Sequence, residues 1–239
     1  MIQSPRIATS GIVIEQKTTI RSAGAPGEVV NRTLMLQGDK EKFLFDERIS
    51  VVLDADNQTA TILDRSARTF HALPLGKILG TMLDPNRLLY VTFKSTDKTR
   101  ELLGSKCQEY TNLRYHGAAL VVTSACFSTQ AKGSDDFRRF IKSMVRNLRL
   151  PERWVSIPAG MPLEIESTRK GNLAYHFPDL SVEQEAHIRS TIAHIPTDLT
   201  QVVVTRITPE KLAPEVFNTP VGYTRIGPPN QSQRLKGRG

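Results

Sequence analysis

Two cysteines, Cys107 and Cys126, are the residues of this 239-residue chain whose type and spacing point most directly to chemistry. If the dipeptide at 116–117 forms a two-residue hairpin turn, Tyr115 pairs with Ala118 and, further along the same ladder, Cys107 pairs with Cys126. Facing Cα atoms in such a ladder lie roughly 4.5–5.5 Å apart, within the range that a disulfide tolerates. We therefore predict a Cys107–Cys126 disulfide, which is typical of an oxidising compartment. The alternative interpretation is a pair of buried free thiols.

No catalytic or cofactor motif accompanies the cysteines. The chain has no G-x-S-x-G elbow, no Cys-His motif and no glycine-rich phosphate loop. The five histidines are scattered, and the two that could share a helix face, His187 and His194, lie seven residues apart rather than the three or four usual for metal ligands. The sequence therefore predicts a protein that is not an enzyme, with no metal and no cofactor.

Two acidic patterns have simpler interpretations than catalysis. Residues 54–57 begin like a calcium loop, but Gln58 stands where an oxygen-rich side chain is needed and the turn glycine is missing. A hairpin turn at Asp56-Asn57 explains this segment better, because both residues tolerate positive φ. Glu164 and Glu166 lie on one side of a predicted strand, where we expect them to face solvent.

The densest positive segment of the chain, whose formal net charge is +8, is offset only by Asp135, Asp136 and Glu152. It consists of Arg138, Arg139, Lys142, Arg146, Arg149 and Arg153. A solvated helix face is the simplest interpretation, and contact with anionic lipid headgroups or with an acidic protein is the alternative. Nucleic acid is disfavoured as a partner because only Trp154 lies nearby to stack on a base.

The elements that would position these residues are mostly strands. Alternation with period two runs from Gly11 to about Leu73, and it returns at Leu89–Lys94, Cys107–Arg114, Ala118–Phe127, Pro158–Arg169 and Gln201–Ile207. The short spacing, with no long helix between the N-terminal strands, predicts an antiparallel meander.

Three helices are expected, at Leu75–Leu83, after Ser134, and at Ser181–His194. The second is the clearest, with Ser134 as a possible N-cap and two aspartates in its first turn. Its apolar residues recur at helical spacing and form one stripe: Phe137, Phe140, Ile141, Met144, Val145 and Leu148. Such a stripe needs an apolar sheet face to pack against.

The two ends of the chain differ from its middle. Residues 1–10 have no apolar core of a secretory signal, so the expectation is either a cytoplasmic protein or a mature secreted form, and the cysteines favour the second. Residues 227–239 are rich in Pro, Gly and basic side chains and are expected to be disordered. No stretch approaches the roughly 20 apolar residues of a membrane span. We therefore expect one domain over residues 11–226.

The order of several short motifs resembles a known bacterial family. They are the Gly38-Asp-Lys40 turn, the Leu53-Asp-Ala-Asp56 turn, Leu73-Pro74, Gly104-Ser-Lys-Cys-Gln-Glu-Tyr110, Arg206-Ile207, and the segment through Val216-Phe217 to Pro220-Val-Gly-Tyr223. The family has a G-x-x-C-x-x-Y strand, then a helix and a closing F-x-x-P-x-G-Y segment, and it is similar to the periplasmic lipoprotein carriers LolA and LolB. The resemblance spans roughly Gly11–Ile226. This chain departs from it in an extra helix after Leu173 and in having no signal peptide.

The resemblance implies a mainly β protein with helices (α+β), a curved antiparallel half-barrel whose concave face is covered by helices. We therefore expect a periplasmic or otherwise extracytoplasmic binding protein for a lipid or the acyl group of a lipoprotein. Its expected lining is Leu34, Leu36, Phe43, Phe45, Phe137, Phe140, Ile141 and Met144. The alternative is a structural or adaptor subunit of a cell-envelope assembly, with a filled half-barrel and a basic face that docks a protein partner.

Overall fold

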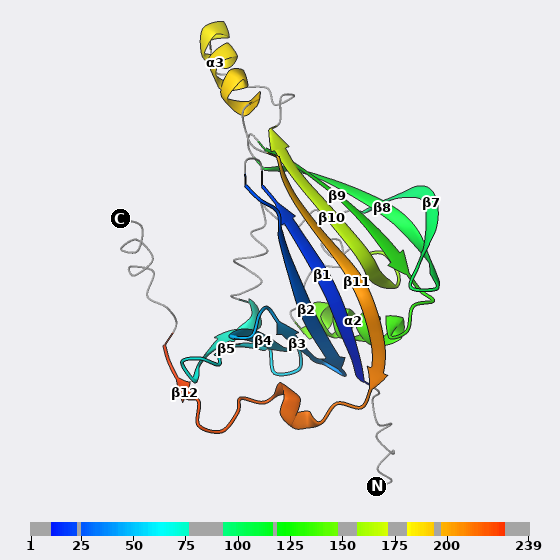
Figure 1. Cartoon of the computed structure of the whole chain (residues 1–239), viewed down its shortest axis with the longest axis vertical. Helices are drawn as coiled ribbons and strands as arrows, with labels where there is room; N and C mark the ends of the chain where they lie inside the picture. The colour runs from blue at the N-terminus through cyan, green and yellow to red at the C-terminus, as the bar shows by residue number, and fades with distance from the viewer. Residues whose placement is uncertain are drawn as a thin grey trace.

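Twelve strands form one sheet in the part of the chain that the computed structural model describes, residues 11–22, 25–76, 93–116, 119–147, 157–171, 181–193 and 197–227. The strands are β1 (Gly11–Arg21), β2 (Glu28–Gln37), β3 (Lys40–Leu44), β4 (Ile49–Asp54), β5 (Thr59–Asp64), β6 (Thr69–Pro74), β7 (Lys94–Leu102), β8 (Ser105–His116), β9 (Ala119–Ser128), β10 (Met161–Gly171), β11 (Asp198–Glu210) and β12 (Thr224–Arg225). Their order across the sheet is β12-β6-β5-β4-β3-β2-β1-β11-β10-β9-β8-β7. The predicted mainly β, largely antiparallel architecture is confirmed (Figure 1).

Strand β11 joins the two halves of the sheet. Strands β1 to β6 form one antiparallel meander and β7 to β10 form another, and β11 lies between β1 and β10. Its pairing with β1 runs from Gly11 opposite Glu210 to Arg21 opposite Leu199, with one bulge on the way. Figure 1 shows β1 and β11 side by side along the middle of the sheet. Residues near the two ends of the described chain therefore hold the halves together.

Each face of the sheet has its own apolar core. One face, here called the helix face, carries alternate residues such as Ile12, Ile14 and Leu36, which pack in one cluster with Phe140 of helix α2 (Ser134–Asn147). The opposite face, here called the strap face, carries a second set of buried residues such as Leu63. The period-two alternation of the strands places the two sets on opposite sides.

The strap face is covered by residues 211–226, which we call the C-terminal strap. Leu212 and Phe217 are buried against Val52 and Leu63, with a 3₁₀ turn at Pro214–Phe217. The strap ends in β12, which pairs in parallel with β6, while the other described strand pairs are antiparallel. In Figure 1 the strap runs from the end of β11 beneath β3, β4 and β5 to β12. The segment Val216–Tyr223 thus closes this face.

Side-chain and main-chain hydrogen bonds fasten the strap at several points. The Leu212 amide donates to Gln37 Oε1 at 2.8 Å, and Lys42 Nζ donates to the Val216 carbonyl at 2.8 Å. Burial, together with the nearby charge of Arg65, lowers the pKa of Lys42, although its hydrogen bond to the strap remains available to either protonation state.

The predicted turn at Asp56-Asn57 is longer than expected. Strands β4 and β5 are joined by the four residues 55–58, and positive φ falls on Gln58 rather than on the predicted dipeptide. Asp54 organises this turn by accepting hydrogen bonds from the main-chain and side-chain nitrogens of Asn57, each at 2.9 Å. Burial opposes ionisation of Asp54, but these bonds and Lys40 outweigh it and keep its pKa below the ordinary value. The acidic pattern is thus explained by a turn.

The pairing of β8 with β9 differs from the predicted register by two residues. His116 lies opposite Ala119 and Tyr115 opposite Leu120, whereas the predicted ladder had Tyr115 opposite Ala118. Strand β7, whose sequence KSTDKTREL is almost entirely polar, was not predicted. Residues 89–92 of the expected strand Leu89–Lys94 lie outside the described residues, and Lys94 begins β7. Most of the expected helix Leu75–Leu83 also lies outside them, as do residues 1–10 and 228–239.

Helix α3 (Val182–Ala193) confirms the helix expected after Leu173. Ser181 caps it reciprocally: its hydroxyl accepts from the Gln184 amide, and Gln184 Oε1 accepts from the Ser181 amide. The helix is largely exposed and extends away from one end of the sheet, far from α2 (Figure 1). Among the described residues no helix combines the length and apolar character that a membrane crossing requires.

Candidate ligand-binding interface between helix and sheet

Helix α2 lies across the helix face and is fixed at both ends. At its start, Ser134 Oγ donates to the Ser128 carbonyl at 2.7 Å at the end of β9, so Ser134 anchors the helix rather than capping it as predicted. At its end, Asn147 Nδ2 donates to the Ala55 carbonyl at 3.0 Å in the turn after β4. The helix therefore spans the sheet from β9 to β4, and its position does not depend on apolar packing alone.

A glycine allows the chain before α2 to approach the sheet closely. Gly133 has φ of +76°, and a Cβ atom there would lie 2.6 Å from Cδ1 of Ile12. A larger residue would therefore be strained in its backbone and would also displace Ile12 from the core. This contact sets the distance between the first turn of α2 and β1.

The structure packs seven of the eight predicted lining residues into one cluster. Leu34, Leu36 and Phe140 are buried in it, and Phe43, Phe137, Ile141 and Met144 pack against it while only partly buried. Phe45 lies at the edge and is 37% exposed. The helix stripe and the sheet therefore meet as the periodicity predicted, and whether they open to admit a ligand stays a prediction.

An arginine and two phenylalanines form the edge of this interface. The rings of Phe43 and Phe45 pack edge to face with centroids 4.4 Å apart. The Arg32 guanidinium carbon lies 5.7 Å from the centre of the Phe43 ring and 5.5 Å from that of Phe45. Arg32 Nε is buried and, among the described residues, has no hydrogen-bond partner. A cation is thus held beside an exposed apolar edge, where cation–π attraction partly replaces its hydration.

Glu41 is a functional candidate that was not predicted from the sequence. It lies opposite Leu36 on one side and Leu53 on the other, both within or against the helix-face cluster. Burial raises the pKa of the Glu41 carboxyl from 4.5 to about 7. Arg32 lies two residues before Leu34, and Glu41 lies two residues before Phe43, so each polar residue shares the helix face with its apolar neighbour. The period of two in the sequence therefore already placed both residues on this face.

The predicted basic face is only partly a free positive surface. Arg138 pairs with Asp135 at 3.0 Å and Arg139 with Asp136 at 3.3 Å, each one turn earlier on α2. Lys142 and Arg146 are exposed on the same helix. The other two residues of the set, Arg149 and Arg153, lie outside the described residues. Salt bridges within the helix therefore offset about half of its described positive charge.

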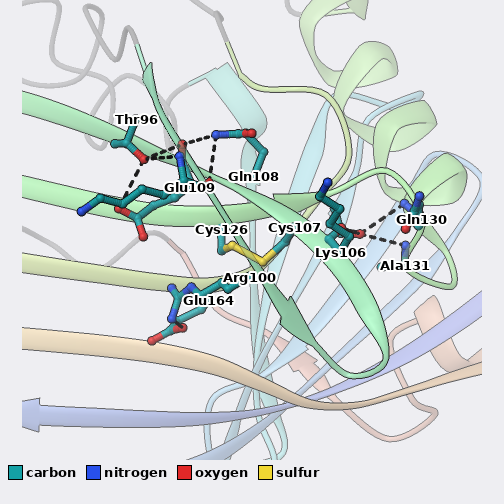
Figure 2. Close-up of a disulfide and its surroundings, with 12 residues drawn as sticks. Thr96, Arg100, Lys106, Cys107, Gln108, Glu109, Cys126, Gln130, Ala131 and Glu164 are labelled. Atoms are coloured by element: carbon teal, nitrogen blue, oxygen red, sulfur yellow. Dashed lines mark hydrogen bonds and ion pairs between the residues drawn. A yellow bond between two sulfur atoms is a disulfide. The ribbon is translucent and has the colours of Figure 1, made fainter.

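The predicted disulfide is confirmed, with a different geometry from that expected. Cys107 and Cys126 are bonded with their Cα atoms 5.5 Å apart, and both residues are buried (Figure 2). Cys126 lies opposite Glu109 rather than Cys107, so the bridge runs diagonally between the two strands. Diagonal neighbours share a face of the sheet, which is why a register shift of two residues preserved the pairing.

An ion pair lies beside the disulfide and engages one of the two carboxylates expected to face solvent. Arg100 lies opposite Cys107 in the ladder, and its guanidinium contacts the Glu164 carboxylate at 2.7 Å (Figure 2). Gln201 Nε2 donates to the same carboxylate at 2.8 Å. The Glu164 side chain is therefore largely buried, and each of its two carboxylate oxygens has a partner.

A pocket of about 250 Å³ lies elsewhere, where β7, β8 and β9 meet the loops before α2 and β10. This pocket was not predictable from the sequence, because one wall belongs to the unpredicted strand β7 and because its lining comes from four separate segments. Among the described residues, no group of three or more His, Cys, Asp or Glu side chains is arranged to bind a metal ion.

Comparisons with known proteins show only distant likeness. No protein family and no curated protein matches the sequence. Among solved structures, PNGF-II in a P21 crystal form is similar, with 10% identity and a TM-score of 0.43 over 92% of this chain; this chain spans 32% of PNGF-II.

Two further solved structures are similar over most of their length. The LolA superfamily protein NE2245 from Nitrosomonas europaea has 6% identity and a TM-score of 0.33, over 89% of this chain and 91% of that one. The lipoprotein LppX from Mycobacterium tuberculosis has 6% identity and a TM-score of 0.31, over 80% of this chain and 84% of that one. Sequence identities and TM-scores this low give no information about the function of this chain, which has to be inferred from the geometry of the site.

Proposed function

We propose that this chain is a non-enzymatic, extracytoplasmic binding protein that holds a lipid, or the acyl group of a lipoprotein, between α2 and the helix face of the sheet. The observation that carries the proposal is the incomplete closure of this interface. Phe140 is only 1% exposed, whereas the helix residues Phe137, Ile141 and Met144 on the same cluster are partly exposed, as is Phe43 on the sheet. Each acyl methylene buried there would contribute about 0.8 kcal/mol.

The charged edge of the interface supports an amphiphilic ligand. Phe45 continues the apolar surface outward, and Arg32 places a positive charge directly over it. A ligand with an apolar chain and an anionic headgroup would satisfy both, since Arg32 Nε is a donor that lacks a partner among the described residues. The disulfide supports a location in an oxidising compartment outside the cytoplasm.

The proposal is tested by mass spectrometry of an organic extract from protein purified from a bacterial envelope, against a mock purification. We expect a lipid in near-stoichiometric amount. Phe45→Ala should lower lipid retention about tenfold because the exposed ring contributes apolar contact area. Val182→Ala, at an exposed apolar position on α3, is the matched control and should retain the wild-type amount.

Headgroup recognition is tested with Arg32→Gln in the same assay. This variant should lose anionic lipids preferentially over zwitterionic ones. An empty extract from protein shown to be folded would contradict the proposal. It would leave the helix and sheet as a filled scaffold and favour the adaptor hypothesis, in which protein partners are sought instead.

A further inference from the structure

The pocket on β7–β9 has an aromatic floor. The rings of Tyr110 and Phe127 meet edge to face with centroids 5.7 Å apart, and Phe93 packs against Phe127 at 5.6 Å in the same way. Phe127 is 5% exposed, so its ring is held by its neighbours and not free to rotate away. The floor is therefore a rigid apolar surface at the base of a small pocket.

Apart from Ala159, the remaining described lining is polar and almost uncharged. It includes two hydroxyl and two amide side chains, Thr99, Gln108, Thr129 and Gln130. Gln108 Nε2 donates to Ser95 Oγ at 3.1 Å and to the Lys98 carbonyl at 3.0 Å, so its amide is fixed in orientation. Within the described residues no hydrogen bond involves Gln108 Oε1, which is thus an acceptor for a ligand.

The disulfide holds the floor from behind. Cys107 lies between the lining residues Lys106 and Gln108, and Cys126 directly precedes Phe127. Because successive side chains of a strand point to opposite faces, the bridge lies on the reverse side of β8 and β9 from the pocket. The separation of the strands that carry the floor is therefore fixed covalently, which favours a preformed site over one that closes on its ligand.

We propose that this pocket binds a saccharide, one pyranose-sized sugar unit at a time. A sugar ring has an apolar C–H face, which the aromatic floor can contact. Its hydroxyl groups surround the ring and can both donate hydrogen bonds to and accept them from amide and threonine side chains. The pocket has a volume of about 250 Å³, and its rim carries hydroxyl and amide side chains. This size and polarity suit a compact polyol and not an acyl chain. Lys106 is the one charged side chain in the described lining, and it admits an acidic substituent on the sugar.

The proposal is independent of lipid binding at α2 and uses different residues. It is tested with saturation-transfer difference NMR on the full chain, with the methyl glycosides of glucose, galactose, mannose, N-acetylglucosamine and glucuronic acid as probes at millimolar concentration. We expect at least one of them to receive saturation, strongest at its ring C–H protons because these contact the aromatic floor.

Two rim variants report on the site without endangering the fold. Thr99→Val and Gln130→Ala replace exposed residues, and each should raise the dissociation constant about three- to tenfold through the loss of one hydrogen bond. Lys132→Ala, two residues from Gln130 and exposed but outside the pocket, should leave it unchanged. Saturation of no probe, or equal dissociation constants in both rim variants and the control, would overturn the proposal. Binding of decanoate at this site in place of every sugar would overturn it as well.

Discussion

Glu41 shows how the setting of one residue changes its chemistry. An exposed glutamate is ionised at neutral pH, but burial between Leu36 and Leu53 raises the pKa of Glu41 to about 7. The folded state therefore holds a proton that the unfolded chain releases at a lower pH. Because the pKa of Glu41 is higher in the folded state than in the unfolded state, protein stability depends on pH.

Stability should fall as pH rises because of Glu41. Its contribution is fully present below pH 4.5 and is lost progressively up to about pH 7, with a total on the order of 3 kcal/mol because each pKa unit corresponds to about 1.4 kcal/mol. Glu41→Gln should remove this slope and be more stable than wild type at pH 8. Urea unfolding at pH 5 and pH 8 measures both effects.

The control for this prediction is Glu47→Gln, an exposed glutamate three residues after β3. It should keep the wild-type pH dependence. Equal slopes for Glu41→Gln and wild type would show that the Glu41 carboxyl remains hydrated in the folded protein.

At the scale of elements, the β8–β9 hairpin separates what the sequence can predict from what it cannot. The strands and the Cys107–Cys126 bond were predictable because period-two alternation places both cysteines on one face. The exact register was not, because it depends on which two residues form the turn. Strand β7 was missed because an edge strand with both sides exposed needs no apolar alternation, and its residues carry no such signal.

The candidate site also has parts that the sequence predicts and parts that it does not. The stripe on α2 predicted its packing partners on the sheet, since helical and strand periods are both visible in the sequence. The positions of Arg32 and Glu41 were visible too, but their significance depends on what surrounds them across neighbouring strands. The saccharide pocket was not predictable, because Thr99, Gln130 and the floor converge only through tertiary structure.

Removing the disulfide should destabilise the hairpin and, with it, the domain. The bridge closes a loop with a sequence separation of 19 residues, for which loop-closure entropy corresponds to about 3 kcal/mol. The double variant with Cys107→Ser and Cys126→Ser should therefore have a free energy of unfolding lower by about that amount, and its urea midpoint should be lower than that of wild type. Wild type measured with reductant serves as the comparison, since reduction breaks the same bond without changing side-chain volume. An unchanged midpoint in both would show that the hairpin is held by its ladder alone.

At the scale of the whole molecule, the C-terminal strap is the element that makes the strap face a core. Phe217 is its most deeply inserted aromatic residue, packed with Val52 and Leu63 across the sheet. Without the strap these residues would form an exposed apolar surface on β4 and β5. The strap is thus part of the domain, although it contains almost no regular structure.

Shortening the Phe217 side chain, which anchors the strap, should lower the stability of the protein substantially. Phe217→Ala should lower the free energy of unfolding by about 3–4 kcal/mol, from lost burial and the cavity left between strap and sheet. Val221→Ala, four residues later and fully exposed, should change it by no more than about 0.5 kcal/mol. Urea denaturation of the two variants checks the difference. Similar values for both would mean that the strap is not coupled to the cooperative unfolding of the sheet.

The position of β11 also sets the order in which this chain can fold during synthesis. The edges of β1 and β10 stay unpaired until residues 198–210 have left the ribosome, because only β11 lies between them. Two open strand edges invite intermolecular pairing, and contacts between distant parts of a chain form slowly. Both edges therefore stay open to wrong pairing until β11, the last long strand in the described sequence, has been synthesised.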